Sequence, residues 1–312
     1  MPERWLDGSR RAPDEEVEAL GAVVARVAGT GFAIERARGG MSTPVYRLHR
    51  DGECQYLRLS EDPGGSMHAE AAVLERLRAA GVSVPEVIAV DEAPEIGRGV
   101  MLVREVPGEP LADAGGIDRA PTLRAAGRDL ARINAVAVEG FGWIRRDEPV
   151  WPPRGEDPTY EALVEGATAS IEVVAGRLAT DKARRALAAS FAQAQASDPP
   201  SRLAHGDFDA THIYQRDGRY TGVIDFGEMR GAESHYDLAF FLVQDPAEEM
   251  LPDLIEGYAD VGTAPGDLRR SATVIVATQL CRWITRDGVE SLDRPSGRWW
   301  LTRLGTLLAD AT

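Results

Sequence analysis

The most informative part of this chain reads HGDFDATH over residues 205–212 and VIDFG over residues 223–227. Between these stretches, two short strand-like runs, residues 212–215 and 220–224, flank the dipeptide Asp217-Gly218, which is typical of a two-residue β-hairpin turn. Such a hairpin can bring together three polar side chains that lie five and then thirteen residues apart in the sequence: Asp207, His212 and Asp225.

These three residues supply the groups that phosphoryl transfer needs. That reaction uses a carboxylate to orient and deprotonate the attacking hydroxyl, and further ligands for a Mg²⁺ ion that bridges the nucleotide phosphates. Because Mg²⁺ prefers oxygen ligands, Asp225 is the natural anchor for the metal. The competing interpretation, that Asp207 and Asp225 only cap turns beside Gly206 and Gly227, fits their joint spacing less well.

The N-terminal part of the chain predicts a sheet with one inserted helix, preceded by an opening helix. Short runs rich in β-branched and aromatic residues alternate with the turns Gly39-Gly40 and Asp51-Gly52, which favours an antiparallel meander. Apolar residues at helical spacing mark the helices. The predicted elements are helices over residues 14–28 and 68–80 and strands over residues 32–38, 44–49, 55–60, 86–90 and 100–104.

From Pro121 onward, apart from the hairpin, the periodicity is mostly helical. We therefore place a boundary near Pro107, which gives an N-terminal domain over residues 1–106 and a C-terminal domain over residues 107–312. Two lobes joined by a short connector leave a cleft, which is a common place for a ligand. The predicted helices cover residues 123–137, 160–178, 181–196, 250–258, 268–285 and 298–309.

Composition limits the kinds of protein this chain can be. Its 312 residues, 44% of them apolar, are enough for two domains with a large core. A net charge of −15 is poorly suited to holding a phosphate backbone, so nucleic acid is disfavoured as a partner. The opening segment lacks an apolar signal region, and no run reaches 18 apolar residues. We therefore expect a cytoplasmic protein with no membrane partner.

The residues from His205 to Gly227 resemble the catalytic loop H-G-D-x-x-x-x-N and the metal motif I-D-[WF]-G of the aminoglycoside phosphotransferase family, which has a protein-kinase-like fold. The resemblance implies an α+β, two-lobed fold, with an N-terminal antiparallel sheet lobe that holds one helix and a mainly helical C-terminal lobe. Weaker matches are a nucleotide-binding turn at residues 38–46, a third strand at 55–59, a hinge at 101–111, EGFG at 139–142 and YDLA at 236–239.

The resemblance also implies roles for individual residues. Asp207 would be the catalytic base, and Asp225 the principal Mg²⁺ ligand. His212 stands where most members of the family have Asn, although macrolide phosphotransferases resemble this chain in having His there. An imidazole would keep the metal coordinated but also suits softer divalent ions, and a purely structural histidine is the alternative. We expect His205 to be a structural residue of the loop and Asp237 to tie the helical lobe to it.

For ATP, the resemblance implies a cationic clamp on the third strand. The family's usual lysine is absent there, since Lys182 is the only lysine in the chain, and Arg58 stands in its place. Glu70, twelve residues further on, would form the strand-to-helix ion pair with Arg58, although both could be surface charges. The other residues assigned to the nucleotide are Gly39, Gly40 and Ser42 in the phosphate-binding turn and Glu105 in the hinge.

The acceptor is less well defined by the sequence. The best candidates to contact it lie beside the base and the metal motif: Asp209, Glu228 and Arg230. Residues 231–268 also hold nine acidic residues and no Lys or Arg, which fits either a cationic acceptor or an acidic solvated helix face. Three tryptophans could wall an acceptor pocket or pack in the core: Trp283, Trp299 and Trp300.

Together these features favour an ATP- and Mg²⁺-dependent O-phosphotransferase acting on a hydroxyl of a small molecule, with an antibiotic-type acceptor, aminoglycoside or macrolide, first among the candidates. A metabolic kinase resembling choline, homoserine or fructosamine kinases is the alternative, because the motifs do not specify the acceptor. A nucleotide-binding module without catalysis is a further alternative, suggested by His212 and the missing lysine. No obligate protein partner is indicated. Protein kinase activity is disfavoured, because no long activation segment fits between Gly227 and Asp237.

Overall fold

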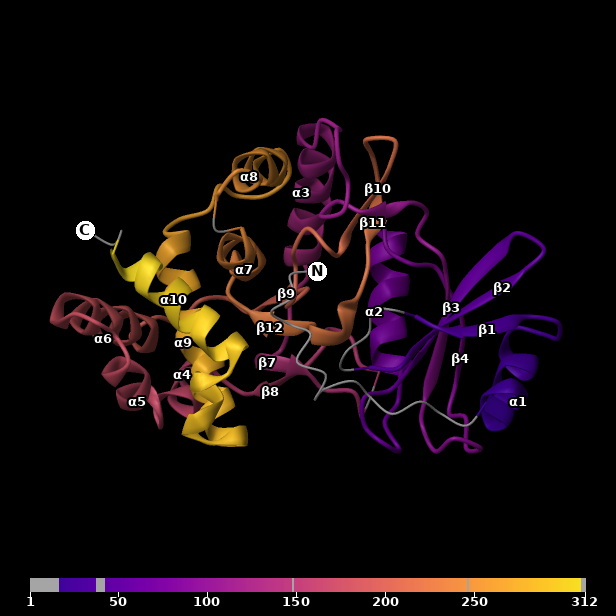
Figure 1. Ribbon diagram of the computed structural model, residues 1–312, viewed down its shortest axis with the longest axis horizontal. Helices are drawn as coiled ribbons and strands as arrows, with labels where there is room; N and C mark the ends of the chain where they lie inside the picture. Colours follow the sequence, from indigo (N-terminus) through magenta and orange to yellow (C-terminus); the bar gives the residue numbers. More distant parts are fainter. Residues whose placement is uncertain (1–16, 38–42, 148, 246, 310–312) are drawn as a thin grey trace.

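The computed structural model describes residues 17–37, 43–147, 149–245 and 247–309. Its elements separate into a sheet-rich N-terminal lobe and a larger helical lobe, at the right and the left of Figure 1. The predicted α+β, two-lobed, protein-kinase-like architecture is therefore confirmed. No helix in the described ranges is long and apolar enough to cross a membrane.

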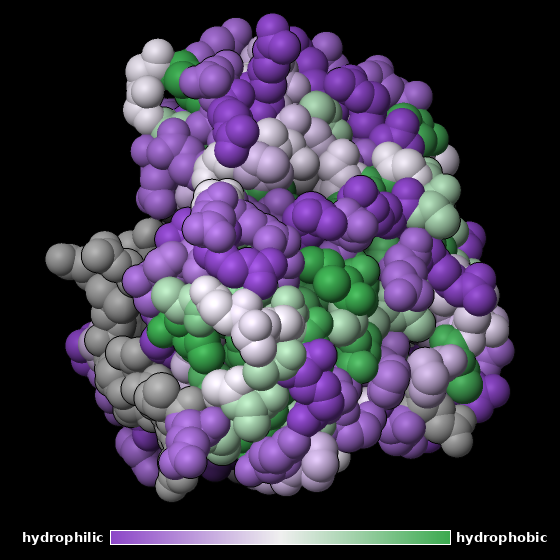
Figure 2. All heavy atoms as spheres, turned by 90° about the vertical axis from the view of Figure 1, so that its right-hand side faces the viewer, coloured by the Kyte–Doolittle hydropathy of each residue, from purple (hydrophilic) through white to green (hydrophobic). Residues whose placement is uncertain are grey.

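A five-stranded antiparallel sheet with the order β1-β2-β3-β5-β4 forms the N-terminal lobe. Each strand lies within a few residues of its predicted position, and helices α1 (Val17–Val27) and α2 (His68–Ala79) accompany the sheet. Viewed from this lobe, the surface shows patches of hydrophobic residues between hydrophilic ones (Figure 2). The strands are β1 (Ala33–Arg36), β2 (Val45–Arg50), β3 (Glu53–Leu59), β4 (Val87–Asp91) and β5 (Val100–Arg104).

Side chains of β3 alternate between the two faces of this sheet, as the two-residue period of a strand requires. Leu57 and Leu59 pack in one apolar cluster with Leu20 of α1. Between them, Arg58 meets Glu70 of α2, which belongs to the opposite side of the sheet. Strand periodicity thus places Arg58, like Tyr56, on the face of β3 that points toward the rest of the molecule.

A second, three-stranded sheet joins the two lobes. Strand β6 (Glu109–Pro110) pairs with β10 (Ile213–Arg216), which forms the predicted hairpin with β11 (Arg219–Val223). In the hairpin, Ile213 pairs with Val223. Residues 212 and 224 are therefore neighbours at its open end, which brings HGDFDATH next to IDFG. The predicted division between residues 106 and 107 falls between β5 and β6.

The C-terminal lobe is mainly helical, as predicted. Its helices are α3 (Ala120–Asn134), α4 (Tyr160–Thr168), α5 (Ile171–Gly176), α6 (Asp181–Gln195), α7 (Tyr236–Gln244), α8 (Leu251–Ala259), α9 (Leu268–Asp287) and α10 (Pro295–Ala309), with the short 3₁₀ helices η2 (Phe226–Glu228) and η3 (Val289–Asp293). Helices α3 and α8 pack very closely at Gly127, which has no side chain. A Cβ there would lie 2.2 Å from the Leu254 carbonyl oxygen. Helix α9 is buried along most of its length and contacts α4, α6, α7 and α10.

Three features of this lobe differ from the prediction. A four-stranded sheet with the order β8-β7-β12-β9 was missed, because strands this short show no apolar alternation. Helix α7 was missed because it is buried nearly all round and so lacks a polar face. The single helix predicted over residues 160–178 is wrong, since Ala169 and Ser170 separate α4 from α5. The missed strands are β7 (Phe141–Ile144), β8 (Gly155–Asp157), β9 (Arg202–Ala204) and β12 (Arg230–Ala232).

Candidate active site

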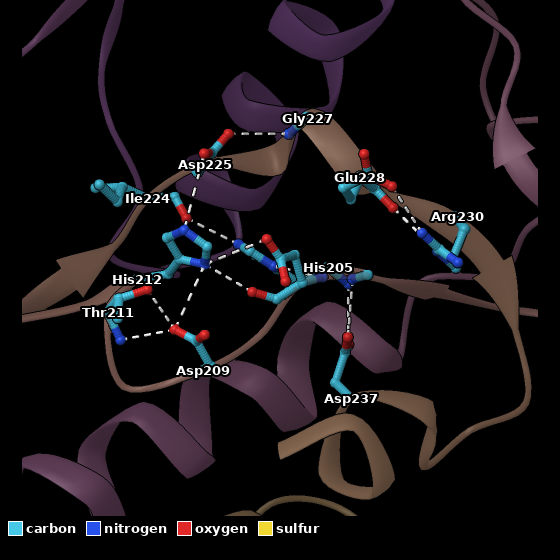
Figure 3. Close-up of polar contacts among 12 residues, drawn as sticks. His205, Asp209, Thr211, His212, Ile224, Asp225, Gly227, Glu228, Arg230 and Asp237 are labelled. Atoms are coloured by element: carbon cyan, nitrogen blue, oxygen red, sulfur yellow. Dashed lines mark hydrogen bonds and ion pairs between the residues drawn. The ribbon is translucent and has the colours of Figure 1, made fainter. Parts of the chain in front are cut away.

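Asp237, in the first turn of α7, holds the start of the loop that carries Asp207 (Figure 3). Its carboxylate accepts hydrogen bonds from the backbone N–H groups of His205 and Gly206 and from the side-chain amide of Asn134, each at 2.9 Å. Burial raises the pKa of Asp237, and these three donors oppose the rise. Asp237 therefore ties the helical lobe to the loop, as predicted.

Gly206 allows the loop to pass directly against η2 and β12. Its φ of +89° is in the left-handed region, and a Cβ there would lie 1.9 Å from the carbonyl oxygen of Glu228 and 2.9 Å from Nε of Arg230. Only glycine fits both conditions. As a result, Glu228 and Arg230 lie against the residue that immediately precedes Asp207.

His205 is fully buried and makes two hydrogen bonds with opposite requirements. Its Nε2 donates to the carbonyl of Ile224 at 2.8 Å, whereas Nδ1 accepts from the backbone N–H of Asp207 at 3.3 Å. Both bonds are satisfied only by the neutral ring. Burial, and then the neighbouring His212, lower the pKa of His205 to about 4. The predicted structural role of His205 is confirmed by this geometry.

The hairpin brings Asp207, His212 and Asp225 together, as the sequence predicted. Figure 3 shows His212 pointing toward Asp225. His212 lies between the two carboxylates: its Nδ1 is 4.0 Å from Oδ2 of Asp207, and its Nε2 is 3.8 Å from Oδ2 of Asp225. Nδ1 also donates a hydrogen bond to the backbone carbonyl of Asp207 at 2.7 Å. About 40% of the Asp207 side chain is exposed, against 16% of that of His212. The base is thus the more accessible of the two.

Asp225 connects this cluster to the N-terminal lobe. Its backbone is left-handed, with a φ of +68°, and its Oδ1 accepts hydrogen bonds from the Gly227 N–H at 3.4 Å and from a guanidinium N–H of Arg58 at 2.8 Å. Burial alone would raise the pKa of Asp225, but the positive charges of Arg58 and His212 outweigh it and lower the pKa. Asp225 is therefore held as a carboxylate.

The predicted ion pair between Arg58 and Glu70 is formed, and it extends further than the sequence indicated. Glu70, only 1% exposed, also accepts a hydrogen bond at 3.1 Å from Arg146, which follows β7 in the other lobe. Arg146 in addition donates to the carbonyl of Gly227. Sequence reasoning missed Arg146, because no local motif marks it and only the fold brings it to Glu70.

Asp209 is turned back onto its own loop. Its Oδ1 accepts hydrogen bonds from the backbone N–H of Thr211 at 2.7 Å and from the Thr211 hydroxyl at 2.5 Å. The same oxygen lies 3.8 Å from Nδ1 of His212. Ligand atoms of Asp207, Asp209 and His212 all lie within 4.8 Å of one another, but those of Asp209 and His212 already have hydrogen-bonding partners. The arrangement stabilises the loop rather than presenting Asp209 outward.

Glu228 and Arg230 pair with each other beside the loop. The Glu228 carboxylate accepts hydrogen bonds from Arg230 and from the indole N–H of Trp143, both at 2.9 Å. Arg230 also donates to the Tyr236 hydroxyl at 3.0 Å, and its guanidinium lies over the rings of Trp143 and Tyr236. These two aromatic residues and Arg282, whose guanidinium lies over the same Trp143 ring, were not among the predicted site residues.

The remaining residues assigned to the nucleotide stay predictions. Gly39, Gly40 and Ser42 are outside the described residues. Glu105 directly follows β5, and its carboxylate interacts with the thiol of Cys54, whose pKa is raised by burial and then by Glu105. Its assignment to the nucleotide stays a prediction.

Most of the acidic residues between 231 and 268 have structural partners. Asp245 and Asp267 accept backbone hydrogen bonds at the starts of α8 and α9. The acidic helix face is therefore tied mainly to the protein itself. The residues that form ion pairs with arginines are Glu248 with Arg269, Asp253 and Glu256 with Arg124, and Asp260 with Arg128.

The C-terminal tryptophans form a cluster in which the rings of Trp283 and Trp299 both pack edge-on against Trp300. Trp283 and Trp300 are buried, and Trp299 packs partly buried against the same core. Of the two possibilities left open by the sequence, the core is the one these contacts support.

A sheet lobe that points Arg58 at a loop-and-hairpin cluster of Asp207, His212 and Asp225 in a helical lobe defines a kinase-like phosphotransferase fold. In agreement, the family model described as "Phosphotransferase enzyme family" matches residues 33–271, and the chain belongs to that family. Among curated proteins, none matches the sequence.

Solved structures of similar shape come from the same class. Aminoglycoside phosphotransferase APH(4)-Ia is 16% identical, with a TM-score of 0.70 over 95% of this chain and all of that one. The GDP and kanamycin complex of APH(2")-IIia is 14% identical, with a TM-score of 0.66 over 95% and 100% of the two chains. Macrolide 2'-phosphotransferase MphH from Brachybacterium faecium is 20% identical, with a TM-score of 0.57 over 95% and 99%. At such identities the likeness concerns the fold.

Proposed function

We propose that this protein is an ATP-dependent O-phosphotransferase that transfers the γ-phosphoryl group to a hydroxyl of a small molecule. The observation that carries the proposal is the meeting of Asp207, His212 and Asp225 at one point, opposite Arg58 of the other lobe. Support for the nucleotide comes from APH(4)-Ia, which has been crystallised with ADP and hygromycin B and with AMP-PNP and hygromycin B. Because another relative was solved with GDP, GTP belongs in the nucleotide test.

Asp207 is the proposed general base. Although 40% of its side chain is accessible, surrounding protein atoms exclude enough water to raise its pKa, and the carboxylates of Asp209 and Glu228 raise it further, against the opposing charge of His212. A raised pKa makes the carboxylate a stronger acceptor for the hydroxyl proton. In this class of reaction, much of the rate enhancement comes from positioning the hydroxyl in line with the phosphoryl group.

His212 and Asp225 are the proposed ligands of Mg²⁺. The donor set fits, because Nδ1 of His212 donates to the Asp207 carbonyl and so leaves Nε2 for a metal, directed toward Oδ2 of Asp225. Burial lowers the pKa of His212, but the carboxylates of Asp207, Asp209 and Asp225 outweigh it and raise the pKa. The same negative surroundings attract a divalent cation. When bound, Mg²⁺ would neutralise charge on the nucleotide phosphates.

Arg58 is the proposed phosphate clamp, and Glu70 positions it. Arg58 is nearly buried and reaches Asp225, so its guanidinium already lies at the proposed metal site. Glu70 holds Arg58 from the side of α2, and Arg146 in turn holds Glu70. An arginine carries out this task with a planar group that stays charged at every physiological pH.

The test measures ATP and GTP consumption by the full chain with Mg²⁺ and a panel of hydroxylated acceptors that starts from hygromycin B, kanamycin and a macrolide. Asp207→Asn should abolish turnover and leave nucleotide binding within about threefold, because it removes the base but not the clamp. Asp217→Asn, at the exposed hairpin turn, is the matched control. Undiminished turnover by Asp207→Asn would refute the assignment. Nucleotide binding without turnover on any acceptor would favour the non-catalytic alternative.

A further inference from the structure

A pocket in the helical lobe opens beside the loop that carries Asp207. Its walls come from β7, β12, α4, α7 and α9, and they include Arg230, Tyr236 and Arg282. Because Arg230 lines the pocket and lies against Gly206, the pocket adjoins the residue that immediately precedes the proposed base. A molecule that presents a hydroxyl to Asp207 can therefore extend into it.

The two arginines of the pocket differ in their partners. Arg230 is satisfied, since it binds the Glu228 carboxylate, the Glu228 carbonyl and the Tyr236 hydroxyl. Arg282 has no hydrogen bond or ion pair with any residue in the described ranges, and its guanidinium carbon lies 4.7 Å from the centre of the Trp143 ring. The Glu228 carboxylate near it is already occupied by Trp143 and Arg230.

The surroundings of Arg282 make an unpaired cation costly. Burial, and then the like charge of Arg230, lower its pKa, and the opposing effects of Tyr236, Asp157 and Glu228 do not outweigh them. One acidic residue, Glu233, also lines the pocket. Arg282 is partly buried, and an oxyanion beside its guanidinium would relieve the cost of withdrawing the charge from water.

Resting on the proposed function, we propose that the acceptor carries an oxyanion, a carboxylate or a phosphate, in addition to its reacting hydroxyl, and that Arg282 binds this oxyanion in the pocket beside Gly206. The planar guanidinium suits either group, because both accept two parallel N–H donors. The pocket thus selects acceptors by a negative charge. The acidic residues of the 231–268 segment that are bound elsewhere do not contribute to this selection.

The test uses acceptors in matched sets: gluconate with gluconamide, glycerate with glyceramide, glycerol 3-phosphate with glycerol, and kanamycin as a cation. Nucleotide consumption is followed for the wild type, Arg282→Gln and Arg282→Lys, with Arg269→Gln as control because Arg269 lies at the start of the same helix and pairs with Glu248. Any acid that the wild type phosphorylates should have a higher kcat/KM than the neutral compound of its matched set. Arg282→Gln should raise its KM about 10- to 100-fold with kcat within about twofold, and Arg282→Lys should recover part of the loss.

A second measurement separates this proposal from the proposed function. Thermal unfolding of each variant is followed with and without the same acids. Arg282→Gln should unfold at or above the wild-type temperature, since it removes a partly buried charge that has no ion-pair partner among the described residues, but should lose the stabilisation by the acids. If the acids raise the unfolding temperature of the wild type but not of Arg282→Gln, and no acceptor is turned over, the oxyanion site is supported and the proposed phosphoryl transfer is refuted. Turnover confined to neutral or cationic acceptors, an acid KM unchanged in Arg282→Gln, or no stabilisation by any acid would overturn the oxyanion site.

Discussion

Replacing Glu70 by Gln removes the charge that holds Arg58 in place. Glu70 is 1% exposed and binds Arg58 through one carboxylate oxygen and Arg146 through the other. Breaking a buried ion pair by changing one partner costs about 3–5 kcal/mol, because the other charge is left uncompensated. Arg58 keeps Asp225, and about a third of the Arg146 side chain is exposed (32%), so we expect the lower end of that range, about 3 kcal/mol.

The assay is urea unfolding of the wild type and of Glu70→Gln, with KM for ATP measured on the folded proteins. Besides the loss of about 3 kcal/mol in unfolding free energy, we expect at least a tenfold rise in KM, because Arg58 is then oriented by Asp225 alone. Glu75→Gln, on the exposed face of the same helix, is the matched control and should change unfolding by less than about 0.5 kcal/mol.

A double-mutant cycle with Arg58→Met completes the test. If the pair acts as a unit, the two single changes should show a coupling energy of about 1–3 kcal/mol. A loss in Glu70→Gln below about 1 kcal/mol, or purely additive effects, would refute the reasoning. Either result would mean that water, rather than Glu70, satisfies the Arg58 guanidinium.

Three further predictions concern the metal site, the loop backbone and the buried histidine. Asp225→Asn should raise the Mg²⁺ concentration for half-maximal turnover by about tenfold or more, as MgCl₂ titration of the activity would show; an unchanged titration would remove Asp225 from the metal site. Gly206→Ala should cost about 3 kcal/mol or more in urea unfolding because its Cβ would meet the Glu228 carbonyl, whereas Gly218→Ala, also at positive φ but in open space, should cost about 1 kcal/mol; equal losses would contradict the clash. His205 titrates at about 4 when folded but at about 6.5 when unfolded, so the unfolded state binds more protons between these values and stability falls as the pH drops, by up to about 1.4 kcal/mol per pH unit. Between pH 7 and pH 5 the loss of unfolding free energy should therefore be about 2 kcal/mol smaller in His205→Gln, and an equal loss would show that His205 titrates normally.

The parts of the site that lie close together in the sequence could be predicted, and the parts assembled by distant elements could not. Asp207, His212 and Asp225 belong to one loop and one hairpin, so turn chemistry alone indicated that they meet. Arg146 reaches the site from just after the end of β7, and Arg282 from the C-terminal part of α9. Their positions depend on the short four-stranded sheet and on helix packing, which leave no periodic trace in the sequence.

Charge patterns were informative in one place and ambiguous in another. The pairing of Arg58 with Glu70 was implied by the family resemblance, and the strand period of β3 places Arg58 on the side of the sheet where Glu70 of α2 lies. The acidic run from residue 231 to 268 allowed two interpretations, because composition cannot show which carboxylates cap helices and which face a ligand. Contacts such as Asp245 with the start of α8 resolve this for most of the run.

The arginine on β3 has a consequence for chemical labelling. Nucleotide analogues that acylate or sulfonylate an amine depend on a lysine beside the phosphates, and Arg58 offers no such nucleophile because a guanidinium stays protonated. The only side-chain amine of this chain is that of Lys182, exposed on α6 in the helical lobe. Amine-directed ATP probes should therefore not label the nucleotide site of this protein in an activity-based screen. Probes that react with 1,2-dicarbonyl chemistry at arginine are the appropriate choice.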